Sequence, residues 1–466
     1  MQPEKPAMQT TISPFSLTNI RLFILFRVLF NARFYYPVFT ILFLDYGLSI
    51  EQFALLNTVW AFTIVLAEVP SGALADLLGR KRLLVGTTLL MMAEMALIAF
   101  VPLGNISLIF SVFLVNRILS GLAEAMASGA DEAMAYDTLV EAGIADQWPR
   151  VLDLQMRAQN IGYIFAMTLG ALAYDPGMVN TCIHWLGWEG SVDQQVTMRY
   201  PLYLTLLLGI LAWLTTLQMR DPQVVNGSIN LDTAGRVRMI EVLRMTLGAG
   251  GWILRTPFAL AIILFAMSFD HTLRMIVTMT SQYYRLIQLP EASFGLIGSA
   301  VALLGLFVPR VARWLSEHYS PQKNVLLLLA LALATLFGLT LFIPYLGLFP
   351  MMLVFIGMML TSFFTSHYLN QITSSDHRAT VLSFKGLAFN AAYGLIGIFY
   401  ALLISRLRAQ QGALHPDWLP EEVGDAAFEA SISWFPWYLL AVLALVALLS
   451  LPRMRKKELE QIGKGR

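Results

Sequence analysis

Twelve runs of about twenty predominantly apolar residues dominate this sequence. An α-helix rises about 1.5 Å per residue, so a run of this length can cross the hydrocarbon core of a bilayer. We therefore expect an all-α polytopic membrane protein with twelve transmembrane helices. The runs lie near 22–44, 52–75, 83–103, 106–129, 156–174, 200–218, 256–284, 293–315, 324–345, 348–370, 380–405 and 434–452.

Composition and charge agree with this interpretation. Of the 466 residues, 57% are hydrophobic and only 13% are charged, as is typical of polytopic membrane proteins. With both termini in the cytoplasm, most Lys and Arg residues fall on the cytoplasmic side, where positive charge concentrates in membrane proteins. We therefore expect an integral membrane protein of a bacterial inner membrane. The basic residues that fall outside are Arg199, Arg285, Arg406 and Arg408.

The even distribution of the runs predicts two pseudo-symmetric six-helix bundles. Residues 1–219 would form the first bundle, 220–255 a basic cytoplasmic linker, and 256–466 the second bundle with a basic tail. The turn 310–323 follows the eighth run, which is the position that 72–84 occupies in the first half. This is a weak trace of the internal repeat that many transporters contain.

The segment 72–84 is a short basic stretch between two apolar runs. Its pattern, Gly-x-Leu-Ala-Asp-x-x-Gly-Arg-Lys-x-x-Leu, resembles the signature loop between the second and third helices of the major facilitator superfamily. The resemblance implies that Asp76 meets the N-terminus of the eleventh helix, and that Arg80 meets an acid at the end of the fourth helix, either Asp131 or Asp137. The implied conformational latch comprises Gly72, Asp76, Gly79, Arg80, Asp131 and Asp137.

Charged residues within the predicted spans are the candidate substrate or coupling-ion sites, because a charge in the bilayer is costly and needs a reason. Arg117 and Glu124 are seven residues apart and share a helical face. Arg117 with Gly121 also resembles the family's fourth-helix motif, which is linked in drug exporters to proton coupling. A structural pair between Arg117 and Glu94 is the alternative.

Two further candidate groups lie in the first and seventh spans. Asp270 and Arg274 are four residues apart and can pair along one helix, while His271 could titrate near neutral pH. A self-neutralised internal ion pair is the alternative there. Arg33 lies beside aromatic residues and Pro37, where it could line a cavity or form a structural pair.

Several signatures are missing from the sequence. The fifth span has Gly162, Ala166 and Gly170 but lacks the Gly-Pro pattern that many exporters of this superfamily carry, which weakens the case for drug–proton antiport. We find no phosphate-binding loop, no paired metal-ligand spacing and no nucleophile elbow. The sequence therefore predicts no catalytic residues, no cofactor, no metal and no nucleic-acid partner.

The predicted function is secondary active transport of a small solute by alternating access. As a hypothesis, protons supply the gradient, with Glu94, Glu124 or Asp270 as the carboxylate that binds them. The expected partners are a small-molecule substrate, protons and the lipid bilayer, with the protein as a monomer. Drug or metabolite efflux and organic-anion uptake both remain open. A transporter-like sensor or scaffold is the alternative from another class, and a membrane enzyme has the least support.

Overall fold

The computed structural model describes residues 13–222, 251, 256–372 and 375–464. The regular structure in these residues is helical, without strands. The first half of the chain contributes α1 (Thr18–Asn31), α2 (Phe39–Asp45), α3 (Ile50–Leu78), α4 (Arg80–Phe100), α5 (Ile106–Ala127), α6 (Ala130–Glu141), α7 (Trp148–Tyr174), α8 (Pro176–Trp185), α9 (Gln194–Thr197) and α10 (Tyr200–Gln218).

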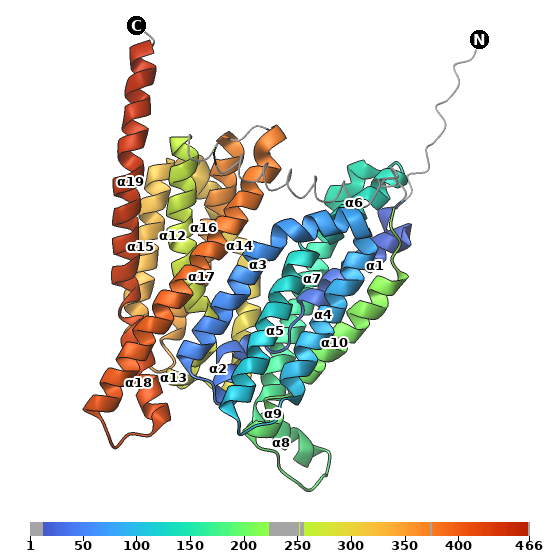
Figure 1. Cartoon of the computed structure of the whole chain (residues 1–466), viewed down its shortest axis with the longest axis vertical. Helices are drawn as coiled ribbons and strands as arrows, with labels where there is room; N and C mark the ends of the chain where they lie inside the picture. Colours follow the sequence, from blue (N-terminus) through green and yellow to red (C-terminus); the bar gives the residue numbers. More distant parts are fainter. Residues whose placement is uncertain (1–12, 223–250, 252–255, 373–374, 465–466) are drawn as a thin grey trace, which may run out of the picture.

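The second half contributes α12 (Pro257–Thr278), α13 (Thr280–Leu286), α14 (Phe294–His318), α15 (Pro321–Leu339), α16 (Leu348–Ile372), α17 (Ser375–Leu414), α18 (Pro420–Ile432) and α19 (Phe435–Lys464). The long helices of each half form one group, and the two groups stand side by side (Figure 1). We call the end where α1 begins and α19 ends the terminus side, at the top of Figure 1, and the opposite end the gate side.

The expected twelve spans are confirmed. Eleven helical segments of the described chain are long and apolar enough to cross a membrane. The twelfth is α7, which has 27 residues and therefore a length of about 40 Å. Its first turns carry Gln155, Arg157 and Gln159, which lower its mean hydropathy. The protein is thus an all-α integral membrane protein.

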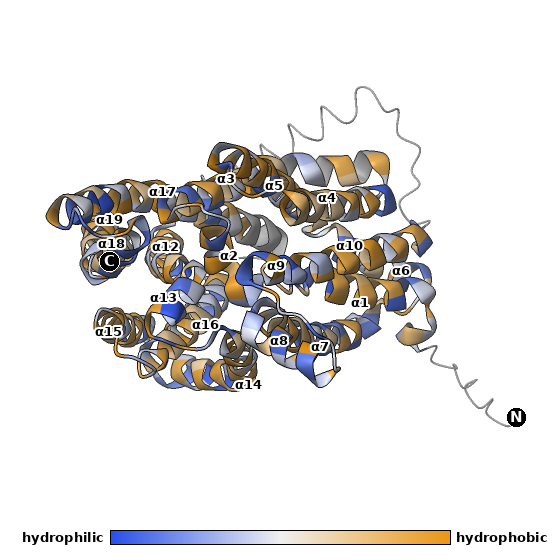
Figure 2. Ribbon diagram, turned by 90° about the horizontal axis from the view of Figure 1, so that it is seen from below, coloured by the Kyte–Doolittle hydropathy of each residue, from blue (hydrophilic) through white to orange (hydrophobic). Residues whose placement is uncertain are grey.

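The surface of the helix groups is apolar, as a bilayer requires. Leu66, Phe349 and Leu448 are more than 70% exposed on the isolated chain. In the view along the helices the long elements are largely hydrophobic, while hydrophilic residues gather in α13 and nearby loops (Figure 2). The long helices therefore present their apolar faces to lipid.

The first span of each half is broken near the gate side, whereas the sequence predicted continuous spans over 22–44 and 256–284. Pro37 lies in the short 3-10 helix Tyr36–Val38 between α1 and α2, and Met279 separates α12 from α13. Hydrogen bonds between the two breaks satisfy backbone groups on both sides. The backbone N–H of Thr40 donates to Ser281 Oγ at 2.9 Å, and Thr40 Oγ1 donates to the carbonyl of Thr278 at 2.6 Å.

Several predicted loops are helical. Arg80, Lys81 and Arg82 lie in the first turn of α4 instead of in a loop, because Gly79 alone separates α3 from α4. Asp221 Oδ1 accepts the Lys81 N–H at 2.8 Å and so satisfies a free donor at this helix N-terminus.

The acidic stretch after the fourth span forms α6. On the gate side, α17 continues to Leu414 as a helix of 40 residues, longer than the predicted span 380–405. The assignment of 220–255 as a linker concerns residues that lie almost entirely outside the described chain.

Close backbone contacts hold α7 in place. At Gly170, an added Cβ would lie 1.8 Å from the carbonyl oxygen of Phe34, and at Gly295 it would lie 2.2 Å from that of Met167. The first contact joins α7 to the break after α1, and the second joins α7 to α14 in the other half. Both contacts require a residue without a side chain.

We predict that Gly170→Ala destabilises the protein by about 1–3 kcal/mol, because the new methyl group would force α7 away from Phe34. Gly305→Ala is the matched control, since it also adds a methyl group to a helix but has no atom within 4 Å. The free energy of unfolding in detergent micelles measures both variants. Equal values for the two would contradict the packing argument.

Candidate functional site

The interior of the first half contains a buried ion pair. Arg33 follows the C-terminal end of α1, and its Nη1 lies 2.8 Å from Glu94 Oε1 on α4. The two side chains are 5% and 0% exposed. Asn116 of α5 donates to the backbone carbonyl of Glu94 at 2.9 Å, so three helical segments meet at this pair.

Arg117 does not pair with Glu94, contrary to the structural alternative that we considered. Its Nε donates to Asn116 Oδ1 at 2.9 Å, and its guanidinium lies 5.5 Å and 5.6 Å from the ring centres of Phe39 and Phe43. Its Nη2 is buried without a hydrogen-bond partner in the described chain. Arg117 is therefore a buried cation held by aromatic faces.

Glu124 differs from the other acidic candidates. It lies two helical turns after Arg117 on α5, and its side chain is exposed. Within the described residues no cation lies at ion-pair distance from it, although it is in electrostatic range of Arg33. Glu124 is thus a carboxylate that remains accessible in the span of α5.

The second half contains a corresponding charged group on α12. Arg274 Nη2 lies 2.6 Å from Asp270 Oδ2, and Arg274 Nη1 donates to Asn390 Oδ1 of α17 at 3.0 Å. The guanidinium also lies 5.4 Å from the ring centre of Tyr393. Asp270 and Arg274 therefore meet as the sequence spacing predicted, and α17 fixes their orientation.

His271 is directed away from this pair. Its Nε2 lies 2.8 Å from the hydroxyl of Tyr438 on α19, and its Nδ1 contacts the carbonyl of Met267. Because a carbonyl only accepts, Nδ1 carries the proton and Nε2 accepts from Tyr438. The structure thus separates His271 from Asp270 and Arg274, although the three are close in sequence.

Three residues of the predicted latch, Arg80, Asp131 and Asp137, take part in two separate ion pairs. Of the two acids expected to meet Arg80, the structure places Asp137 of α6 against it. Asp131 instead accepts from Arg27 of α1 at 3.0 Å, and Glu132 accepts from the same guanidinium at 3.1 Å. Gly72, the side chain of Asp76 and the first residues of α17 belong to the part whose side chains are not described.

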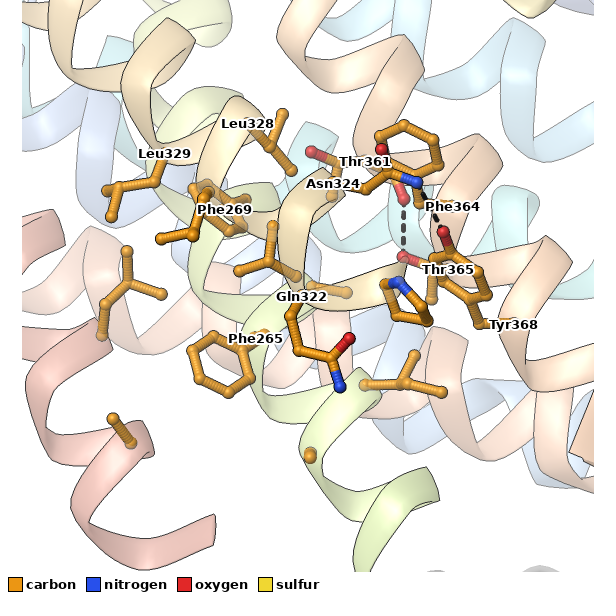
Figure 3. A pocket seen from close by; sticks show the side chains of 18 of the residues that line it. Phe265, Phe269, Gln322, Asn324, Leu328, Leu329, Thr361, Phe364, Thr365 and Tyr368 are labelled. Atoms are coloured by element: carbon orange, nitrogen blue, oxygen red, sulfur yellow. Dashed lines mark hydrogen bonds between the residues drawn. The ribbon is translucent and has the colours of Figure 1, made fainter. Parts of the chain in front are cut away.

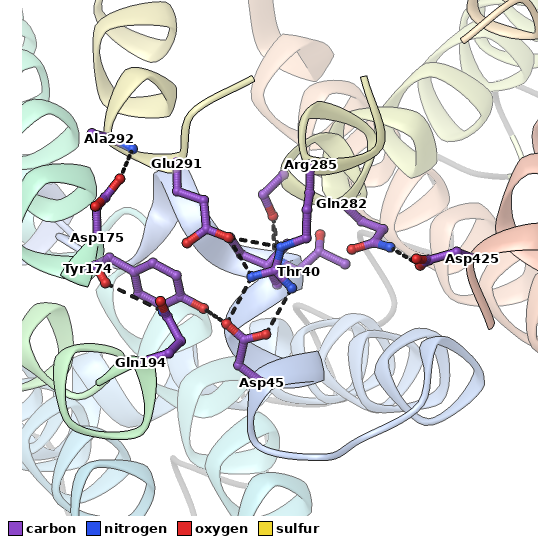
Figure 4. Close-up of polar contacts among 12 residues, drawn as sticks. Thr40, Asp45, Tyr174, Asp175, Gln194, Gln282, Arg285, Glu291, Ala292 and Asp425 are labelled. Carbon is purple, nitrogen blue, oxygen red and sulfur yellow. Dashed lines mark hydrogen bonds and ion pairs between the residues drawn. The ribbon is translucent and has the colours of Figure 1, made fainter. Parts of the chain in front are cut away.

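A polar cluster that the sequence did not predict lies between the two halves on the gate side (Figure 4). Arg285 at the end of α13 makes two parallel contacts with Asp45 at the end of α2, at 2.8 Å and 2.9 Å, and a third with Glu291 at 2.7 Å. The Tyr174 hydroxyl at the end of α7 donates to Asp45. We call these four residues the gate cluster.

Electrostatics hold the gate cluster together. Burial alone would lower the pKa of Arg285, but hydrogen bonds and charges from Asp45 and Glu291 outweigh burial and raise this pKa above its usual value. The only sequence signal was that Arg285 is one of the few basic residues on the predicted outer side. Its partner lies 240 positions away, which no local pattern reveals.

Other contacts between the halves also gather toward the gate side. Arg408 Nε lies 3.1 Å from Glu51, and the backbone N–H of Ala292 donates to Asp175. The innermost described contacts lie near mid-height, where Thr58 donates to the Gly394 carbonyl at 3.2 Å. Toward the terminus side the two helix groups diverge, most visibly at α3 and α17 (Figure 1). The protein is therefore closed on the gate side.

A cavity of about 100 Å³ lies between the halves, beside the two helix breaks. It is lined from the first half by Tyr36, Phe39 and Tyr163, and from the second by residues that include Thr278 and Tyr284. Its walls thus combine aromatic side chains with aliphatic residues and hydroxyl groups. Among the described residues, no three His, Cys, Asp or Glu side chains are arranged to hold a metal ion.

Two helix groups of similar size, joined on one side around a charged interior, define a polytopic transporter of two halves. Solved structures share this arrangement at low sequence identity. The nucleoside transporter NupG has a TM-score of 0.68 and 14% identity, covering 92% of this chain and 98% of that one. A bacterial homologue of the human lysosomal transporter Spinster, inward-facing and unoccupied, has a TM-score of 0.68 and 14% identity, and the match covers 94% of this chain and 98% of that one. A D-xylose–proton symporter has a TM-score of 0.62 and 13% identity, and the match covers 91% of this chain and 96% of that one.

The family model described as Major Facilitator Superfamily matches residues 22–401, so the chain belongs to this superfamily. It is therefore a secondary transporter, and members of this class are generally not enzymes. Quinolone resistance protein NorA of Staphylococcus aureus (strain Mu50 / ATCC 700699) is 24% identical over 203 residues. This match covers 43% of the chain and 44% of NorA, less than half the length of either protein.

We predict that Glu94→Leu destabilises the protein by about 3–5 kcal/mol, because it leaves Arg33 buried without its counter-charge. The double variant Arg33→Met/Glu94→Leu should recover most of this loss. Denaturant titration in micelles measures both. Asp153→Ala, which breaks the exposed pair with Arg157, is the control and should cost less than about 1 kcal/mol. A double variant as unstable as the single one would refute the pairing argument.

We predict that Arg285→Gln loosens the gate side. The reporter is a cysteine introduced as Tyr36→Cys in a Cys182→Ser background. A membrane-impermeant maleimide is applied from the gate side of uniformly oriented proteoliposomes, and its rate of reaction with this cysteine is measured. Loss of the gate cluster should raise the labelling rate at least about threefold by shifting the population toward an open gate. Arg199→Gln is the control, because the hydrogen bonds of Arg199 in the described chain go to carbonyls of Ala99 and Val101 in its own half. Equal rates in both variants would exclude this role.

Proposed function

We propose that the protein is a proton-coupled transporter that exports an amphipathic organic solute across a bacterial inner membrane. The observation that supports transport by alternating access most directly is the uneven distribution of contacts between the halves, which hold the gate side closed while the helix groups diverge on the terminus side. Such asymmetry is what one end state of an alternating-access cycle requires. In this proposal the gate side faces outward, both termini are cytoplasmic, and the protein acts as a monomer.

Glu124 is the carboxylate that we assign to proton coupling. Glu94 and Asp270 each have an arginine partner at ion-pair distance, whereas Glu124 is exposed and has none in the described chain. A deprotonated Glu124 competes with Glu94 for Arg33, and protonation ends this competition. Proton binding on α5 would thereby change the contact between α1 and α4, which gives a physical link between protonation and helix movement.

On the terminus side, the pair Arg80–Asp137 would serve as a conformational latch between α4 and α6. Arg27 with Asp131 would hold α1 against α6 in the same region. Gly72, Asp76 and Gly79 complete this latch by resemblance to the superfamily motif. The latch would bind and release as the terminus side closes and opens.

The substrate class rests on two observations. The aromatic residues Tyr36, Tyr163 and Tyr284 line the cavity between the halves, and although its volume of about 100 Å³ holds only part of a drug-sized molecule, their rings would contact a flat, partly apolar solute. The partial likeness to a protein named for quinolone resistance agrees with efflux of such molecules. Uptake of an organic anion is the second candidate, because Arg117 is a buried cation without a carboxylate partner among the described residues.

We predict that Glu124→Gln lowers gradient-driven flux at least about tenfold while substrate binding persists, because the amide cannot carry a proton. Flux of a fluorescent quinolone and of a labelled organic anion is measured in proteoliposomes under an imposed pH gradient. Glu317→Gln, which alters an exposed pair with Arg313, is the control. Unchanged flux in Glu124→Gln would remove this residue from the coupling path, and Glu94→Gln and Asp270→Asn would then be tested. Binding without flux in the unmodified protein would favour a sensor.

A further inference from the structure

The second half contains a larger cavity that the transport mechanism does not use (Figure 3). Its volume is about 540 Å³, within the range of about 300–1,000 Å³ that is typical of ligand sites. Its walls come from α12, α15, α16 and α19, so it lies within one helix group and not between the two. The lining side chains are predominantly apolar, with Phe265, Phe269, Leu328, Leu329 and Phe364 among them.

The cavity opens toward lipid on the terminus side of the bilayer. Gln322 in the first turn of α15 marks its outer edge. Two lining residues are exposed on the surface of the helix group, Leu326 of α15 at 63% and Ala444 of α19. Because this surface is apolar and borders the bilayer, the opening between α15 and α19 admits molecules from the membrane.

We propose that this cavity binds the hydrocarbon chain of a single-chain membrane amphiphile. The apolar walls disfavour a polar solute, and among the described residues no Lys or Arg lines the cavity to bind a phosphate. Access from the bilayer identifies the membrane as the source. This inference does not depend on the proposed transport function, because it concerns binding alone.

An occupant would also affect the transport helices. Phe269 lines the cavity, while the next residue, Asp270, pairs with Arg274 on another face of α12. A chain inserted between α15 and α19 therefore touches the helix that carries the charged group of this half. Occupancy would restrict movement of α12 during the transport cycle.

The test uses a 16-carbon primary alcohol with a diazirine near its methyl end, added to the full-length protein in lipid nanodiscs. After irradiation, peptide mass spectrometry maps the labelled residues. We predict that labelling concentrates on cavity residues of α12, α15 and α16, and that Ala444→Trp reduces it at least about fivefold by filling the mouth. Ala441→Trp is the control, because Ala441 is exposed on the same helix but does not line the cavity. Labelling spread evenly over the lipid-facing surface, or unaffected by Ala444→Trp, would overturn the site.

Discussion

The contact between Asp45 and Arg285 joins two halves that otherwise share few charged groups. Each half contains a buried ion pair of its own, Arg33 with Glu94 in the first and Arg274 with Asp270 in the second. A charge left unpaired in the bilayer would be costly, so these pairs let each half be inserted and packed as a unit. The gate cluster then determines how the two units meet on the gate side.

The helix breaks explain why the halves meet at that level. A break in a transmembrane helix leaves backbone groups without intrahelical partners, and these must be satisfied by protein where water is scarce. The Thr40 N–H donates to Ser281 Oγ and the Thr40 hydroxyl donates to the Thr278 carbonyl across the interface, so the break in the first span is stabilised by the break in the seventh. The same unwound segment positions Arg33 beyond the end of α1, where it reaches Glu94. A single local irregularity therefore shapes both the interior charge pair and the closed gate.

Hydropathy predicted the twelve spans because helix length and apolar content are local properties of the chain. The basic motif around Arg80 and the pairing of Asp270 with Arg274 were also local, and they could be predicted for that reason. The pairs Arg33–Glu94 and Asp45–Arg285 could not, since they depend on how helices far apart in sequence are rotated and packed. His271 shows the limit clearly, because one residue along a helix turns a side chain by about 100°, enough to direct it to α19 and away from Asp270.

A gate must be stable enough to close and weak enough to open. The side chains of Arg285 and Asp45 are 29% and 15% exposed, so solvent screens the pair and limits what it contributes. The tight packing of Gly295 against Met167, by contrast, depends on shape and not on charge. If the gate cluster separates while this contact between α7 and α14 persists, the halves rotate about it instead of coming apart. The arrangement therefore combines polar contacts that can break with a backbone contact that depends on shape, both toward the gate side of the molecule.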